Sequence, residues 1–188
     1  MTTVKRLARW IKGMAGVPGD ADASLRVLMV CTGNICRSPM AEGVLRQRLQ
    51  RAGLAGRVSV DSAGTHGYHT GEAPDARAIR CAGARGYDIA ALKARPVRAE
   101  DFTAFHWLLA MDLGHLAWLE RRLQPGSGGQ AAMLMSFARH HPDQTEIADP
   151  YYGGPAGFEQ ALDLLEDACD GLLERLQADL VGSGPRGD

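Results

Sequence analysis

A cysteine and an arginine lie six positions apart in a loop-like segment, Cys31-Thr32-Gly33-Asn34-Ile35-Cys36-Arg37-Ser38-Pro39. The thiolate of a cysteine is a strong nucleophile, and the planar guanidinium of an arginine can bind two phosphate oxygens at once. A nucleophile and a bidentate phosphate clamp in one loop are the parts of a phosphoryl-transfer site. The segment therefore predicts that Cys31 attacks phosphorus and that Arg37 binds the phosphate.

The elements on either side would place this loop where anions bind. Residues 25–30 form a short apolar run typical of a buried parallel strand, and a helix is expected from Ser38-Pro39 to about Gln50. Ser38 suits the N-cap of that helix, and Pro39 is tolerated in its first turn. The carboxyl end of a strand in an open α/β sheet is a usual ligand site, and the dipole of the following helix favours an anion or a thiolate.

Three further residues suit a loop that holds an anion. Gly33 permits tight backbone geometry, and Asn34 tolerates a left-handed conformation. Ser38 can donate a hydrogen bond to the Cys31 thiolate. The segment lacks the Gly-Lys-Ser/Thr ending of a P-loop nucleoside triphosphatase, which excludes nucleotide hydrolysis of that type.

Strand and helix patterns alternate along the rest of the chain. Further strands are expected at 57–61, 107–111 and 131–137, and helices at 74–85, 100–105, 113–123 and 158–180. With the strand at 25–30 this makes four strands. Alternating strands and helices predict an α/β fold, a three-layer α/β/α sandwich on a four-stranded parallel sheet.

The composition is that of one globular domain, with 188 residues, a formal net charge of -1 and 45% hydrophobic residues. No basic excess indicates nucleic-acid binding, and no apolar run reaches the roughly 20 residues of a membrane span. Four scattered cysteines do not form a secreted disulfide framework, so we expect a reducing, cytoplasmic setting.

The domain boundaries follow from changes in pattern. We expect residues 1–24 to be a basic N-terminal extension and linker, residues 25–181 the folded domain, and residues 182–188 a disordered tail. The alternative for residues 1–24 is a short basic amphipathic helix that contacts an acidic membrane or partner.

These segments, in this order, resemble the low-molecular-weight protein tyrosine phosphatases, and their bacterial members in particular. The likeness spans about residues 25–180 and rests on Cys-x5-Arg-Ser together with the downstream Asp149-Pro150-Tyr151-Tyr152-Gly153. Further family-like blocks are Asp61-Ser62-Ala63-Gly64, Pro74-Asp75-Ala76-Arg77-Ala78, Ala94-Arg95, Asp101-Phe102 and Met111-Asp112. The resemblance implies a phosphatase I-like fold with flavodoxin-like winding, and an enzyme that uses no metal or other cofactor.

The resemblance also implies a role for each residue of the phosphate site. Cys31 forms a cysteinyl-phosphate, while Arg37 and the loop amides stabilise the equatorial phosphate oxygens. Asp149 protonates the leaving phenolate and then helps to activate the hydrolytic water. The rest of the phosphate-binding loop consists of Thr32, Gly33, Asn34, Ile35, Cys36 and Ser38.

Aromatic residues define the expected substrate pocket. A deep slot with aromatic walls favours a phenyl phosphate, which reaches further than a serine phosphate. Tyr68, Tyr151 and Tyr152 are the residues that the resemblance assigns to this pocket. Ser62 and Asp112 are expected to support the loop structurally.

Two other functions are weighed against this one. An arsenate reductase of related fold also begins with Cys-x5-Arg-Ser, but it needs a close downstream cysteine pair that Cys81 and Cys169 do not form. A non-catalytic phosphotyrosine-binding regulator is the second alternative. This alternative is suggested by one difference from the family. Family members often have a histidine just before the position of Ala94-Arg95, where this chain has Ala91 and Leu92.

The second cysteine of the loop has its own expected role. Cys36 can trap oxidised Cys31 in a reversible disulfide, or otherwise lines the loop. A zinc site is disfavoured because no second ligand pair completes the spacing. The partners implied by the resemblance are a phosphotyrosine-containing protein, with a bacterial tyrosine kinase as one candidate, and no nucleic acid. We expect a monomer that forms at most a weak dimer, without a transmembrane segment.

Overall fold

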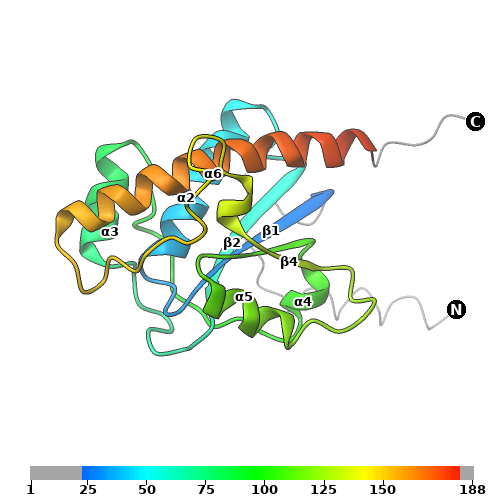
Figure 1. Cartoon of the computed structure of the whole chain (residues 1–188), viewed down its shortest axis with the longest axis horizontal. Coiled ribbons are helices and arrows are strands. Elements are labelled where there is room, and N and C mark those ends of the chain that lie inside the picture. Colours follow the sequence, from blue (N-terminus) through cyan, green and yellow to red (C-terminus); the bar gives the residue numbers. More distant parts are fainter. Residues whose placement is uncertain (1–22, 183–188) are drawn as a thin grey trace, which may run out of the picture.

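The computed structural model describes residues 23–182 as alternating strands and helices (Figure 1). The elements are β1 (Leu25–Cys31), α2 (Arg37–Arg51), β2 (Val58–Gly64), α3 (Ala76–Ala84), α4 (Asp101–Ala104), β3 (Trp107–Ala110), α5 (Leu113–Glu120), β4 (Gln130–Met133), the 3-10 helix η2 (Leu134–Phe137) and α6 (Pro155–Gly182). Most of the expected extension 1–24 and tail 182–188 falls outside the described residues. Within residues 23–182, no helix combines the length and the apolar character needed to span a bilayer.

The four strands form one parallel sheet in the order β2-β1-β3-β4. β1 lies inside the sheet, where Val27 is in register with Val60 of β2 on one side and with Trp107 of β3 on the other. The chain leaves β1 toward β2 through α2 and reaches β3 only later, so the connections diverge at the carboxyl end of β1. In open α/β sheets such a divergence marks the usual ligand site.

Helices cover both faces of the sheet, which confirms the expected three-layer sandwich (Figure 1). α2, α3 and α6 lie on one face, and α4 and α5 lie on the other. β1 is buried on both faces: Val27 and Met29 join the cluster beneath α2 and α6. Leu28 and Val30 join the smaller cluster on the α4 and α5 side. Displacing β1 would expose apolar side chains or leave a void, so the strand is a fixed base for the loop that follows it.

The expected strand at residues 131–137 is wrong in its second half. β4 ends at Met133, and the chain continues as the 3-10 helix η2. Leu134 and Met135 are both buried, in the cluster that also holds the apolar face of α6. A strand sends successive side chains to opposite faces, so burying two consecutive residues under one helix requires the tighter turn.

The expected N-cap of the helix after the loop is also wrong. α2 already begins at Arg37, and its N-cap residue, Cys36, makes no side-chain capping hydrogen bond. Ser38 lies inside the first turn, with its hydroxyl oxygen 3.0 Å from the sulfur of Cys31. Because no side chain caps them, the first N–H groups of α2 remain available to an anion.

α6 packs closely on the chain that follows η2. Asp167 of α6 accepts hydrogen bonds from the backbone N–H groups of Arg139 and His140. One turn further on, Gly171 faces the carbonyl group of Phe137, and a Cβ atom placed on Gly171 would overlap that oxygen. A backbone carbonyl cannot swing away as a flexible side chain does, so this helix position requires a glycine.

Substituting Gly171→Ala should lower the free energy of unfolding by about 1–3 kcal/mol, because the added methyl group forces α6 away from the Phe137 carbonyl. Urea denaturation followed by circular dichroism measures the change. Gly83→Ala is the matched control, because Gly83 lies in α3 with no atom within 4 Å of its added Cβ. The control should be neutral or stabilising by up to about 1 kcal/mol. Equal effects of the two substitutions would contradict the packing argument.

Candidate active site

The loop between β1 and α2 curves around the sulfur of Cys31. The backbone N–H of Asn34 donates to Sγ over 3.3 Å, and the hydroxyl of Ser38 lies 3.0 Å from the same atom. Asn34 has a φ angle of 57°, in the left-handed region that asparagine tolerates better than most residues. Cys31 is only 3% exposed. The loop therefore forms a bowl with the sulfur at its base, in contact with the backbone N–H of Asn34 and the hydroxyl of Ser38.

Arg37 closes one side of this bowl with a buried guanidinium. Its Nη1 donates to Oδ2 of Asp112 over 2.8 Å and to the backbone carbonyl of Ile147 over 3.1 Å, and its Nη2 donates to Oδ2 of Asp149 over 2.8 Å. Partial burial works against ionisation of Asp112, but hydrogen bonds from His115 and Arg37 outweigh it and hold the pKa of Asp112 well below its usual range. The clamp is therefore fixed in place by opposite charge.

Asp149 lies beside Arg37, the residue that directly follows the loop. One of its carboxylate oxygens contacts Arg37, and the other accepts the backbone N–H of Tyr151 over 3.2 Å, which is the Asx turn expected before a proline-containing bend. The side chain is 42% exposed. The carboxylate is thus held near the clamp and also reaches solvent, which is the position that a proton donor to a leaving group requires.

A first side-chain network supports the loop from the side of β2. The amide nitrogen of Asn34 donates to Ser38 Oγ over 2.9 Å and to Ser62 Oγ over 2.8 Å. Ser62 in turn donates to Oε2 of Glu42 over 2.6 Å, and Glu42 also pairs with Arg46. A chain of hydrogen bonds therefore runs from Ser38, the neighbour of the nucleophile, to a carboxyl group on α2.

A second network supports the loop from the opposite side. Thr32, the residue after Cys31, places its hydroxyl oxygen 2.8 Å from Nε2 of His115. His115 lies in α5, and its Nδ1 is 2.9 Å from Oδ1 of Asp112. Asp112 is also the N-cap of α5 and accepts the backbone N–H of His115 over 2.9 Å. The first residues of α5 thus connect the Thr32 side of the bowl with the carboxylate that holds Arg37.

Backbone hydrogen bonds fix the walls of the bowl. The carbonyl of Ile35 accepts the N–H of Asp75 over 2.8 Å, and the carbonyl of Thr32 accepts the N–H of His66 over 3.0 Å. Gly33 lies between these two walls, and a Cβ atom on it would come within 3.0 Å of the ring of His69. Segments before α3 therefore close over the loop.

Cys36 differs sharply from the nucleophile candidate in its surroundings. It is 4% exposed, and burial together with the nearby charges of Asp75 and Cys31 raises the pKa of Cys36 to about 12. Cys36 is therefore a neutral thiol at physiological pH. Both loop cysteines are free thiols in the structure.

The candidate pocket tyrosines differ in how firmly they are held. Tyr151, 38% exposed, lies with its ring 5.4 Å from the guanidinium carbon of Arg77 and edge-on to Tyr152. Tyr152 is 94% exposed, and Tyr68 is 75% exposed and stacks on His66. Of the three tyrosines, Tyr151 is the least exposed.

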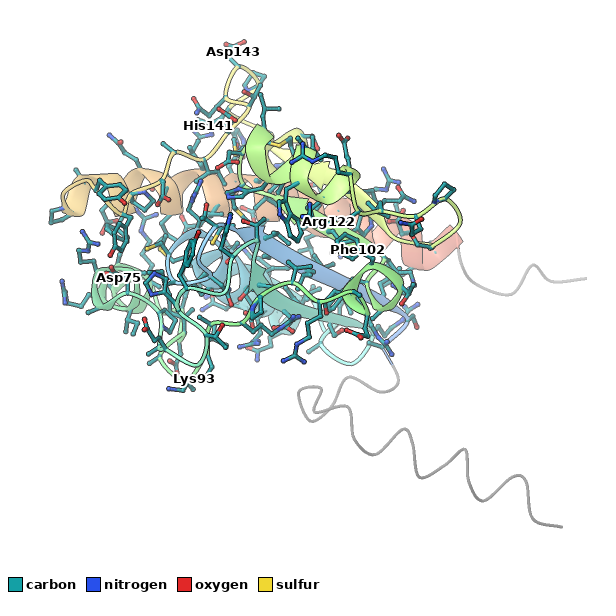
Figure 2. The ribbon with its side chains drawn as sticks, turned by 90° about the horizontal axis from the view of Figure 1, so that it is seen from below. Asp75, Lys93, Phe102, Arg122, His141 and Asp143 are labelled. Atoms are coloured by element: carbon teal, nitrogen blue, oxygen red, sulfur yellow. The ribbon has the colours of Figure 1, made fainter. Side chains whose placement is uncertain are left out.

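The loop that leads to Asp149 is anchored to α6. His140 and His141 each place Nδ1 2.8 Å from a carboxylate oxygen of Asp167. Figure 2 shows His141 and Asp143 on this loop, which extends away from the body of the molecule. The anchor restrains the chain a few residues before the candidate proton donor.

Sequence reasoning missed three contributors to the site. Glu42 is a single carboxylate in the buried run Met40–Leu45, and that isolated charge was a readable signal. His115 lies three residues after Asp112, a spacing that is common at helix starts and singles nothing out. The carbonyl of Ile147 gave no signal, because any residue type supplies a carbonyl.

Comparison with known proteins places the chain in a family. The sequence profile described as low molecular weight phosphotyrosine protein phosphatase matches residues 26–181. A putative low molecular weight protein-tyrosine-phosphatase of Synechocystis is 42% identical over 161 residues, 84% of this chain and 99% of the relative.

Solved structures agree with the sequence comparison. A protein tyrosine phosphatase from Entamoeba histolytica superimposes with a TM-score of 0.79 at 38% identity, covering 83% of this chain and 99% of the other. An arginine phosphatase of Drosophila superimposes with a TM-score of 0.76 at 32% identity, covering 82% and 99%. The chain belongs to the low molecular weight phosphotyrosine protein phosphatase family, a family of hydrolases.

Proposed function

We propose that the chain dephosphorylates tyrosine residues of proteins through a cysteinyl-phosphate intermediate. The observation that carries the proposal is the bowl around Cys31, in which Asn34 and Ser38 address the sulfur and Arg37 stands at the rim. Donors directed at a nucleophile and at the phosphate oxygens act in the transition state, where they lower the barrier most.

The proposed reaction has two steps. In the first, Sγ of Cys31 forms a bond to phosphorus as the bond from phosphorus to the tyrosine oxygen breaks, and Asp149 gives its proton to the departing phenolate. In the second, Asp149 takes a proton from water as the water oxygen attacks phosphorus. The sulfur–phosphorus bond breaks, the thiolate returns and inorganic phosphate leaves.

The ion pair between Arg37 and Asp149 suggests how the proton donor is prepared. In the structure, Nη2 of Arg37 is occupied by Asp149. A phosphate group that binds the guanidinium replaces that carboxylate and leaves Asp149 beside the leaving oxygen. The same displacement releases the carboxyl group of Asp149 from the guanidinium when the leaving oxygen needs a proton.

The proposal extends to the surroundings of the site. Tyr151, held by Arg77, is the proposed wall of a slot that favours the long phenyl phosphate, while the exposed Tyr68 and Tyr152 are proposed contacts for the protein substrate. We propose a cytoplasmic setting, residues 25–181 as the catalytic domain, and a tyrosine kinase as a candidate partner. Ser62 and Asp112 are the proposed structural supports.

The thiols elsewhere in the fold argue against arsenate reduction. Such a reaction needs further cysteines that relay a disulfide. Burial raises the pKa of Cys81 to about 12 and raises that of the fully buried Cys169 further. Neither thiol readily forms the thiolate that disulfide exchange requires.

Cys31→Ser should abolish turnover of phosphotyrosyl peptides, because the hydroxyl is a far weaker nucleophile, while retaining affinity for inorganic phosphate. Assays on phosphotyrosyl, phosphoseryl and phosphoarginyl peptides, with orthovanadate as inhibitor, measure both activity and substrate class. The phosphoarginyl arm is included because of the Drosophila relative. Cys81→Ser is the control and should keep activity. Phosphotyrosyl binding without turnover by the wild type would instead support a non-catalytic regulator.

Asp149→Asn should lower kcat/KM by roughly 100-fold or more for phenyl phosphate, whose leaving group needs a proton. It should have a much smaller effect on p-nitrophenyl phosphate, whose phenolate is stable without one. Asp143→Asn, on the exposed part of the same loop, is the matched control. An equal loss of kcat/KM for both substrates would show that Asp149 is not the proton donor.

Glu42→Gln should change how stability depends on pH. Burial raises the pKa of Glu42 to about 7 from a usual 4.5, although Ser62 and Arg46 work in the other direction. Between those values the unfolded chain releases the proton and the folded chain keeps it, so the contribution to stability falls as pH rises from about 4.5 to 7, by on the order of 3 kcal/mol in total.

Urea denaturation at pH 5 and pH 8 measures this effect. The free energy of unfolding of Glu42→Gln, relative to the wild type, should be higher at pH 8 than at pH 5, because the amide carries no charge to desolvate. Glu120→Gln, on the exposed end of α5, should follow the wild type at both pH values. If the difference in the free energy of unfolding between Glu42→Gln and the wild type were the same at pH 5 and pH 8, the burial of Glu42 would have no effect on its ionisation.

A further inference from the structure

His115 is a buried histidine to which the proposed reaction gives no task. It is 5% exposed and lies in the first turn of α5, which follows β3 on the face of the sheet away from α2 and α6. A buried imidazole carries two polar nitrogens, and burying either one without a hydrogen bond costs free energy. Both of its nitrogens face residues of the active site, one toward the loop and one toward the carboxylate behind Arg37.

The contacts of His115 form a continuous path across the bowl. Nε2 is 2.8 Å from the hydroxyl oxygen of Thr32, whose own backbone immediately follows the nucleophile. Nδ1 is 2.9 Å from Oδ1 of Asp112, and Oδ2 of the same carboxylate receives the guanidinium of Arg37 over 2.8 Å. The path thus begins at one wall of the bowl and ends at the clamp on the other.

The two ends of this path are held by different parts of His115. The backbone N–H of His115 donates to Oδ1 of Asp112 over 2.9 Å. Nδ1 lies 2.9 Å from the same oxygen but lacks the alignment of a hydrogen bond. At the other end of the path, Nε2 shares a hydrogen with the hydroxyl group of Thr32. One residue consequently holds a carboxylate through its main chain and a loop hydroxyl through its side chain.

We propose that His115 is a positioning residue that sets the spacing between the Thr32 wall of the phosphate-binding loop and the Arg37 clamp. The inference rests on the proposed function, because it assigns both ends of the path to binding of the same phosphate. The two ends belong to separate connections, one after β1 and one after β3, which also meet where the N–H of Met111 donates to the carbonyl of Val30.

The physical need for such a link follows from the geometry of phosphoryl transfer. Donors stabilise the transition state only when they point at the positions of its oxygens, and a displacement of about 1 Å can cost roughly 100-fold in rate. The Arg37 head group is set by Asp112, whereas the Thr32 wall is set by the loop. His115 makes these two positions depend on each other.

A double-mutant cycle tests the link. Thr32→Val and His115→Leu each break the same contact and should each lower kcat/KM for a phosphotyrosyl peptide by roughly tenfold, mainly through kcat. The double variant should lose no more than either single variant, because the contact is already gone. His115→Gln should recover most of the loss, since its amide nitrogen lies as many bonds from Cβ as Nε2 does and can still reach Thr32.

Leu119→Ala separates positioning from simple loss of stability. Leu119 is fully buried in the same helix, so its truncation destabilises α5 from another side. It should lower the melting temperature at least as much as His115→Leu while leaving kcat/KM near the wild-type value well below that temperature. Losses that multiply in the double variant, or an equal loss of activity in Leu119→Ala, would overturn the proposal.

Affinity for inorganic phosphate, measured by isothermal titration calorimetry on the same proteins, keeps the two claims distinguishable. If the wild type hydrolyses no phosphoester, the proposed function is wrong. The affinity for phosphate then still tests whether Thr32 and His115 together position the phosphate-binding loop. Affinities that fall together in Thr32→Val and His115→Leu without further loss in the double variant would then support the link. Unchanged or independently falling affinities would contradict it.

Discussion

The charge of Arg37 is the constraint on which the arrangement of this site depends. The residue is 3% exposed, and a buried guanidinium is tolerated only where carboxylates and carbonyl oxygens surround it. Asp112 lies just after β3, and Asp149 and the carbonyl of Ile147 come from the segment before α6. Two distant parts of the chain must therefore meet at the start of α2. Satisfying this single cation gathers the candidate nucleophile, clamp and acid into one place.

Around that cation, the protein supports the loop from both faces of the sheet. On one face the support ends in Glu42 on α2, and on the other it ends in His115 on α5. Each of these groups is buried, and each is reached through a serine or threonine hydroxyl. A hydroxyl can both donate and accept, so it joins a carboxyl group or an imidazole to the loop without adding charge near the nucleophile. These two supports reach the loop through neutral groups, whereas Arg37 is held by the charges of Asp112 and Asp149.

The sequence predicted the fold and the centre of the site, but not what stabilises them. The apolar run before Cys31 and the Cys-x5-Arg spacing are local patterns, and both were readable without coordinates. The contact between Thr32 and His115 joins residues that are 83 positions apart, and it depends on β3 lying beside β1. A single sequence does not encode strand order in any local pattern. The predicted end of β4 was wrong for a similar reason, because the strand stops where the following residues are buried under α6.

The pairing of Arg37 with Asp149 makes binding at this site an exchange of anions rather than an addition. Any incoming oxyanion must displace a carboxylate that already occupies the guanidinium, so its net affinity is the difference between two similar interactions. A monoanion with few oxygens gains little binding free energy by replacing the carboxylate, whereas a phosphate dianion that also contacts the loop amides gains more. In the proposed reaction, the carboxylate of Asp149 would therefore select against the small anions that are abundant in any cell and would weaken retention of the released phosphate.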